Sequence, residues 1–275
     1  MSSFLYFVLP ALGGYTLASV YLLKNPHILH RKKRTAFYST RISHRGGCGE
    51  RIESTMEAFT NAVEQGTQML ELDCHLTNDG HVVVSHDENL RRQTGQDVTI
   101  SSLNLKDLPL YKERLEVTFY AGRFSSGADR RFALLEDVFR KFPEMPVSIE
   151  IKENNHQLIE TNDSMPYSFT MSRGLVLLLL YYSGLLPFVP LGESLLQFYL
   201  PRIINRCDCR SVCLYIITMR KSLFKHLAAR GIQVHLFVCN IDEDIKAALD
   251  VGATGVMSDY PSLLSSYLSR NRRQD

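Results

Sequence analysis

The stretch Met69-Leu70-Glu71-Leu72-Asp73 decides the fold class, because apolar and acidic residues alternate in it at the spacing of a β-strand. Side chains in a strand alternate between two faces, so Glu71 and Asp73 project to the same side of the sheet. The stretch Val147-Ser148-Ile149-Glu150-Ile151-Lys152 repeats this design. Two apolar strands that each end in a charged pair on one face predict the inside of a barrel mouth.

Two histidines close further apolar runs of the same kind. His44 follows Ile42-Ser43, and His86 follows Val82-Val83-Val84-Ser85. Histidines with pKa values near neutrality can exchange protons with a leaving group. Buried carboxylates need a cation or basic partners, and carboxylate oxygens are the ligands that Ca²⁺ or Mg²⁺ prefers. The chemistry that we infer is metal-assisted phosphoryl transfer.

Strand and helix patterns alternate along the rest of the chain, which favours an α/β fold with a parallel sheet closed as a TIM-type (β/α) barrel. The length of 275 residues suits one such domain. We expect helices over Thr55–Gln65, Leu134–Phe142, Ser222–Arg230 and Glu243–Asp250. We expect strands at 41–45, 69–73, 81–86, 147–152, 166–170, near 212–217, at 232–238 and at 255–259.

The first segment, residues 1–24, is predicted to be a membrane anchor. It has about 20 uncharged residues from Phe4 to Leu23, enough to cross the hydrocarbon core as a helix. A cleaved signal peptide is the alternative, but no basic residue precedes the apolar run and no small-x-small cleavage site follows it. The basic cluster of Lys24 and 31–34 predicts a catalytic domain that faces the cytosol, and it could attract an anionic leaflet.

A second apolar run covers 174–191 and is just long enough to span a membrane by hydropathy. A single crossing there would separate the late strands from His44 and Glu71, so no barrel could close. We therefore predict an interfacial or re-entrant segment that admits a lipid tail to the site. A buried core helix is the alternative.

Composition excludes some classes of function. The net charge of +2 is too small to argue for nucleic acid, and the aromatic residues do not alternate with basic ones as in a base-stacking platform. The six cysteines form no paired zinc knuckles, and reduced thiols fit a cytosolic face. Cys207, Cys209 and Cys213 are close enough for a metal or palmitoylation site, although ordinary thiols are favoured because a fourth ligand is absent.

The chain resembles the glycerophosphodiester phosphodiesterase family over nearly its whole length. Within that family, the apolar amino terminus and 184–190 resemble the membrane-associated lysophospholipase D branch. The segments that carry the resemblance are His44-Arg45-Gly46-Gly47, Glu53-Ser54-Thr55-Met56-Glu57-Ala58-Phe59, Glu71-Leu72-Asp73, Ser85-His86-Asp87, Glu150-Ile151-Lys152 and Gly255-Val256-Met257-Ser258-Asp259-Tyr260-Pro261.

The resemblance implies a role for each site residue. His44 and His86 are the general acid and base, one activating the nucleophile and the other protonating the departing alcohol. Arg45 holds phosphate oxygens, for which a salt bridge to a barrel carboxylate is the alternative, and Lys152 neutralises charge at phosphorus. Metal ligands are Glu71, Asp73 and Glu150, with His86 able to touch the ion as well.

Two further acidic residues, Glu50 and Glu53, lie just before the first predicted helix. We interpret both as residues that favour the helix dipole and nothing more.

One part of the family pattern is missing after Lys152. Only 153–165 precede the next strand signal, and about a dozen residues barely make one parallel crossover. We expect a barrel over 40–270 that lacks one βα unit, with a small insertion domain at about 88–133. A barrel that lacks a strand either exposes an edge or rearranges.

The expected activity is that of a metal-dependent lysophospholipase D. It would hydrolyse lysophosphatidylcholine or N-acyl lysophosphatidylethanolamine to lysophosphatidic acid and a head-group alcohol. The family mechanism implies attack by the substrate's own glycerol hydroxyl and a cyclic phosphate that water opens. A shortened, inactive membrane protein and an enzyme for water-soluble glycerophosphocholine are the alternatives. The expected partners are the lysophospholipid and membrane lipid, and the expected location is the endoplasmic reticulum or perinuclear membrane.

Overall fold

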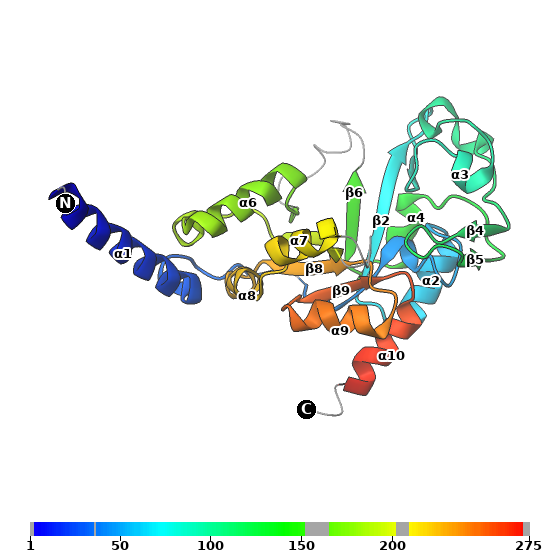
Figure 1. The fold of residues 1–275 in the computed structure, drawn as a ribbon. Helices are drawn as coiled ribbons and strands as arrows, with labels where there is room; N and C mark the ends of the chain where they lie inside the picture. Colours follow the sequence, from blue (N-terminus) through cyan, green and yellow to red (C-terminus); the bar gives the residue numbers. More distant parts are fainter. Residues whose placement is uncertain (1–2, 36, 152–164, 202–208, 272–275) are drawn as a thin grey trace. The chain divides into compact units, whose positions relative to one another are not determined.

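The protein forms two compact units in a computed structural model that describes residues 3–35, 37–151, 165–201 and 209–271 (Figure 1). Lys152 and Cys207 lie outside the described residues, so the predictions for them are not addressed by the fold. The first unit comprises Met1–Tyr38, Pro166–His235 and Leu249–Thr254, and the second comprises Ser39–Met165, Leu236–Ala248 and Gly255–Asp275.

Parallel strands form the centre of the second unit. The strand β1 pairs in parallel with β2 on one side and with β9 on the other, and β2 also pairs in parallel with β6. The first and last strands of the chain are therefore neighbours, as they are in a closed βα barrel. The bounds are Arg41–Ser43 for β1, Met69–Leu76 for β2, Val147–Ile151 for β6 and Gly255–Ser258 for β9.

The strand β3, Val82–Val84, departs from the predicted parallel arrangement. It pairs antiparallel with the end of β2, with Cys74 opposite Val84. The turn between the two strands is only a few residues long, whereas a parallel crossover needs a dozen or more. The prediction of a parallel barrel strand at 81–86 was therefore wrong in orientation.

The strand order in the sheet is β3-β2-β1-β9-β8-β7, with β6 also on β2. The strand β8, Gln233–Phe237, belongs to both units, and β7 is Leu195–Tyr199. The sheet has seven strands, one of which is the antiparallel β3, so the described residues provide fewer than the eight parallel strands of a full TIM-type barrel. This agrees with the predicted barrel that lacks one βα unit.

Two strand predictions were wrong. Residues 166–170 contribute only an isolated bridge between Ser168 and Leu195, and 212–217 lie inside the helix α7, Cys209–Thr218. The β-branched residues near 212 favoured a strand locally, but the helix α7 formed instead. The strand β7 was not predicted, because its sequence Leu-Leu-Gln-Phe-Tyr adjoins an apolar run that masks its boundary.

The helix predictions are confirmed to within a residue or two. In the second unit, α2 begins after Thr55, whose hydroxyl accepts a hydrogen bond from the Ala58 N–H. Phe59 from α2 and Leu70 and Leu72 from β2 lie in one buried core. The bounds are Met56–Glu64 for α2, Leu135–Lys141 for α4, Lys221–Ala229 for α8, Asp242–Asp250 for α9 and Pro261–Asn271 for α10.

The segment between β3 and α4, where the insertion domain was predicted, consists of short elements around a core of its own. Tyr111 and Phe132 stack in that core with ring centroids 4.3 Å apart. The elements are α3 (Arg91–Thr94), the 3₁₀ turns Ile100–Ser102 and Leu105–Asp107, and the hairpin of β4 (Arg114–Glu116) and β5 (Phe124–Ser126).

Two apolar helices characterise the first unit. The helix α1, Ser3–Lys24, is long and apolar enough by length and composition to cross a membrane, with a mean hydropathy of 1.4 over Tyr6–Lys24. The helix α6, Met171–Ser183, has 13 residues and spans about 20 Å, less than the roughly 30 Å of a hydrocarbon core. Its only buried side chain is Leu177, so the alternative of a buried core helix was wrong.

Candidate active site

Three carboxylates converge on one face of the neighbouring strands β2 and β6. The parallel register places Asp73 opposite Glu150, with Glu71 on the same face of β2. Each of the three offers an oxygen within 4.8 Å of those of the other two. Glu71 and Asp73 are buried and Glu150 is exposed. The structure therefore brings together the three residues that were predicted to be metal ligands.

The electrostatics of this carboxylate group favour a cation. Burial, together with the negative charge of Asp73, raises the pKa of Glu71 to about 7, although His44 and the Arg45 backbone N–H oppose the shift. Burial is the larger cause of this shift in pKa, and the second is the repulsion by Asp73, which a cation between the two carboxylates would relieve. A donor set of carboxylate oxygens alone suits a hard divalent cation such as Ca²⁺ or Mg²⁺, so these residues fit the metal that the sequence predicts.

Arg45 lies against the same carboxylates. Its backbone N–H donates to Glu71 Oε2 at 2.8 Å, and its Nε lies 3.9 Å from Asp73 Oδ2. The Arg45 backbone adopts the left-handed region, with φ of 48°, and its side chain is buried. The salt bridge to a barrel carboxylate that was the alternative for Arg45 is thus present, and phosphate binding by Arg45 stays a prediction.

Glu53 is a site residue whose role the sequence did not indicate. It is 2% exposed, receives the forked guanidinium of Arg92 and the Gln93 side-chain amide, and lies 3.3 Å from Arg45 Nη1. Burial would raise the pKa of Glu53, but the charges of Arg45 and Arg92 lower it below its usual value. The interpretation of Glu53 as a helix-dipole residue was therefore wrong. Arg92 is too far away in sequence to reveal the pairing.

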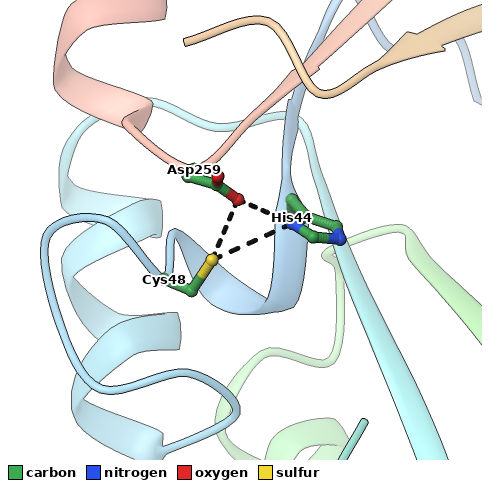
Figure 2. A group of neighbouring side chains, drawn as sticks. All are labelled: His44, Cys48 and Asp259. Atoms are coloured by element: carbon green, nitrogen blue, oxygen red, sulfur yellow. Dashed lines mark hydrogen bonds and ion pairs between the residues drawn. The ribbon is translucent and has the colours of Figure 1, made fainter. Parts of the chain in front are cut away.

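His44 is fixed through its Nδ1 atom (Figure 2). That atom lies 2.6 Å from Asp259 Oδ1, and the Cys48 thiol donates to the same oxygen at 2.9 Å. The other oxygen of Asp259 accepts from Asn240 Nδ2 at 2.6 Å. A neutral imidazole in this position donates its Nδ1–H to Asp259, so its Nε2 is left as a proton acceptor.

The charges around His44 favour its protonated form. Burial alone would lower the pKa of His44, but the carboxylates of Asp259 and Glu71 outweigh burial and raise it. Cys48 also offers a possible metal ligand beside His44 and Asp259. Burial and the Asp259 charge, however, raise the pKa of the Cys48 thiol well above its usual value, so it remains a hydrogen-bond donor.

Asp259 and Asn240 were not assigned roles from the sequence. The sequence did carry a signal for both. Asp259 directly follows β9 and Asn240 lies just beyond β8, at the end of a barrel where catalytic groups gather.

His86 is held in the same way as His44 but in a more exposed place. Its Nδ1 lies 2.6 Å from Asp87 Oδ1, and Asp87 Oδ2 accepts from Arg92 Nε at 2.6 Å. Through Arg92, this chain of contacts reaches Glu53. The carboxylate group described above comprises Glu71, Asp73 and Glu150 in the described part of the chain, so His86 is not brought into it as a ligand.

The fold and the site together define a class of enzyme. Parallel strands bring together carboxylates that could hold a cation, and two imidazoles are each oriented by an aspartate at Nδ1, which leaves Nε2 as the nitrogen for proton transfer. Metal-assisted hydrolysis of a phosphate ester uses such groups.

Known proteins agree with this class. Residues 44–179 match the model of the glycerophosphoryl diester phosphodiesterase family. The chain is 45% identical to lysophospholipase D GDPD3 of Homo sapiens, with 98% of each chain covered, and 43% identical to human lysophospholipase D GDPD1, with 96% of each covered. The chain therefore belongs to the glycerophosphodiester phosphodiesterase family, whose members are phosphoric diester hydrolases.

Solved structures support the fold. A glycerophosphodiester phosphodiesterase from Thermotoga maritima aligns with a TM-score of 0.56 at 20% identity, covering 84% of this chain and 99% of the other. The alignment with the human GDPD3 protein runs over 311 positions, more than the 275 residues of this chain. That relative therefore has residues at positions where this chain has a gap.

Proposed function

We propose that this protein is a metal-dependent lysophospholipase D that releases the head-group alcohol from lysophosphatidylcholine or N-acyl lysophosphatidylethanolamine and leaves lysophosphatidic acid. The observation that carries the proposal is the convergence of Glu71, Asp73 and Glu150 beside an aspartate-held His44. The substrate class is taken from the names of the two human relatives. Their high identity over nearly the full chain supports that transfer.

The cation would be held by the three carboxylates and would supply charge neutralisation at the phosphate oxygens. His44 accepts the proton of the substrate's free glycerol hydroxyl through Nε2 as that oxygen bonds to phosphorus. The bond from phosphorus to the head-group oxygen breaks, and His86 gives a proton to the departing alcohol. Arg45 adds positive charge beside the phosphate.

Opening of the resulting cyclic phosphate uses the same groups in reverse. His86, now neutral, takes a proton from water as the water oxygen bonds to phosphorus. His44 returns its proton to the glycerol oxygen, which leaves phosphorus and becomes a hydroxyl again. Asp259 and Asp87 hold the two rings in place throughout, because each fixes an Nδ1–H.

Access to a lipid substrate is the task that we assign to the apolar helices. On α6, Leu175 is 59% and Leu179 is 70% exposed, an unusual amount of apolar surface for a helix in water. Together with the anchor α1, such a surface suits contact with a bilayer. We propose a membrane-bound enzyme with a cytosolic catalytic domain, at the endoplasmic reticulum or perinuclear membrane.

The test is a product assay on the full chain in mixed micelles. Lysophosphatidylcholine is supplied with Mg²⁺, with Ca²⁺ or with a chelator, and choline and lysophosphatidic acid are measured together. The proposal predicts equal amounts of both products, only with a divalent cation. No release by this chain, under conditions in which the human GDPD3 protein is active, would favour the shortened and inactive membrane protein.

The same assay tests the alternative of an enzyme for water-soluble glycerophosphocholine. An enzyme for glycerophosphocholine would hydrolyse that compound faster than lysophosphatidylcholine, and its rate would not depend on the apolar residues of α6. The proposal predicts the opposite preference.

A further inference from the structure

The first unit contains a cavity of about 620 Å³ beside the carboxyl end of α1. The helix α8 forms the other wall, and the two helices contact each other. Figure 1 shows α8 next to the end of α1. The cavity has the volume of a small ligand site. Its lining residues are Val20, Leu23, Lys24, Pro26, Lys221, Ser222, Lys225 and His226.

Three lysines give this cavity its charge. Lys24, Lys221 and Lys225 are all exposed, and none forms an ion pair with a carboxylate among the residues that the structure describes. No acidic residue occurs in the first turn of α8. Lys221 is the first residue of α8, so its charge adds to the positive end of the helix dipole and favours an anion beside it.

His226 shapes the cavity without adding charge. Its Nδ1 donates to the Leu23 carbonyl at 2.8 Å, which ties α8 to the last turn of α1. Burial lowers the pKa of His226 to about 4, so the ring is neutral at physiological pH. The remaining wall is apolar, from Val20, Leu23 and Pro26. A ligand with an anionic head and an apolar body matches this division.

The same unit places the cavity near an apolar surface. Lys24 ends the apolar helix α1. The Tyr181 and Ser222 hydroxyls lie 2.6 Å apart and join α6 to α8, and the Tyr182 hydroxyl donates to the Ile217 carbonyl of α7. Exposed apolar residues on these helices include Leu175, Leu179, Val212 and Ile216. If this apolar surface contacts a bilayer, lysines at its boundary lie at the depth of the lipid phosphates.

We propose that this cavity binds the phosphate head group of an anionic membrane phospholipid, with Lys24, Lys221 and Lys225 around the phosphate and Val20 and Leu23 along the first part of the acyl chains. It shares no residue with the candidate active site and does not depend on the proposed reaction. Such a site would hold the first unit at the membrane surface by recognition of a lipid, in addition to insertion of α1.

The test uses the full chain in neutral detergent and native mass spectrometry, with dioleoyl phosphatidylserine and dioleoyl phosphatidylcholine as probes. Diacyl lipids have no free glycerol hydroxyl, so turnover by the proposed reaction does not confuse the measurement. We compare wild type with Lys221→Gln/Lys225→Gln. The matched control is Lys106→Gln/Lys112→Gln, which removes the same charge from exposed positions outside the cavity.

The expected result is that wild type and control retain phosphatidylserine in preference to phosphatidylcholine. Lys221→Gln/Lys225→Gln should bind phosphatidylserine about 25-fold more weakly, since each lysine near an anionic surface contributes about fivefold. Lys221→Arg/Lys225→Arg should restore binding because it keeps the charge, and this rescue also shows that the positions tolerate substitution.

Three results would overturn the proposal. Equal retention of the two lipids by wild type would show that the cavity does not recognise an anion. Unchanged retention by Lys221→Gln/Lys225→Gln would place the lipid elsewhere. Displacement of phosphatidylserine by an equal concentration of inorganic phosphate would show a site for free anions, and not for a lipid.

Discussion

Globular proteins usually bury apolar side chains and expose charged ones, and each unit departs from this rule in its own way. The second unit buries charge, with Arg45, Glu53, Glu71, Asp73 and Asp259 all at most 5% exposed. The first unit exposes apolar surface, as at Leu175, Leu179 and Ile216. Charged residues are rarely buried unless paired, and large exposed apolar patches are rare in soluble proteins. Each departure costs stability in water, and we propose that a ligand offsets the cost: a cation and a phosphate in one unit, and lipid in the other.

The largest expected effect concerns the buried charges. Asp73→Asn removes a proposed ligand oxygen and should lower the rate of choline release by about 10³-fold or more, because a bound cation contributes several kcal/mol to the transition state. Glu144→Gln, at an exposed position of the same unit, should leave the rate unchanged. Full activity of Asp73→Asn would remove the carboxylate group from the mechanism.

The buried pairing of Glu53 should matter more for stability than for the chemistry. Glu53→Gln leaves Arg45 and Arg92 without their shared carboxylate, and breaking a buried pair costs about 3–5 kcal/mol in the free energy of unfolding. Denaturant melts measure the loss. Glu113→Gln removes a carboxylate that is 84% exposed and pairs with Arg130, and should cost less than about 1 kcal/mol. Equal costs would contradict the account of Glu53.

Asp259 is expected to act through His44. Asp259→Asn should lower kcat by about 10²-fold or more, because the imidazole loses the carboxylate that sets its tautomer. The Asp259 charge raises the pKa of His44, so its removal should move the acidic limb of the kcat/KM profile to lower pH. A slower variant with an unmoved pH profile would mean that Asp259 only supports the fold. Asp242→Asn, at a more exposed position, is the control.

Cation binding should depend on pH through Glu71. Its pKa is raised from 4.5 to about 7, so below pH 7 a cation must displace a proton, and its affinity should fall by up to about tenfold per pH unit. Without a cation, Glu71 ionises near pH 4.5 in the unfolded chain but only near pH 7 in the folded one. The free energy of unfolding should therefore fall as pH rises from about 4.5 through 7. Melting temperatures with and without Mg²⁺ should diverge as pH rises. A cation effect that is equal at pH 5.5 and pH 8 would count against Glu71 as a ligand.

The smallest expected effect lies in the apolar unit. Leu179→Ser should raise the KM for lysophosphatidylcholine in vesicles several-fold, since less apolar surface is available to bind the bilayer. Its kcat, and hydrolysis of glycerophosphocholine, should not change. Leu110→Ser, which replaces a leucine of the second unit that is 51% exposed, should change neither. A loss of activity on both substrates would point to damage to the fold.

The three carboxylates of the site were more predictable from sequence than the residues that hold Arg45 and His44 in place. Glu71 and Asp73 share a strand, and period-two alternation alone places them on one face. Glu150 joins them because a parallel register aligns strand ends. Glu53 and Arg92 meet across 39 positions of sequence, and Asp259 reaches His44 across 215, so no local pattern reveals either pair. The wrong strand prediction at 212–217 has a local origin, because β-branched residues there favour a strand and the segment is the helix α7.

The most direct test of the central claim is a crystal structure of the chain with Mn²⁺, with the ion located by its anomalous scattering. We predict one strong peak bounded by oxygens of Glu71, Asp73 and Glu150, and loss of that peak in Asp73→Asn. A peak at the His44, Cys48 and Asp259 cluster, or no peak within reach of the three carboxylates, would contradict it.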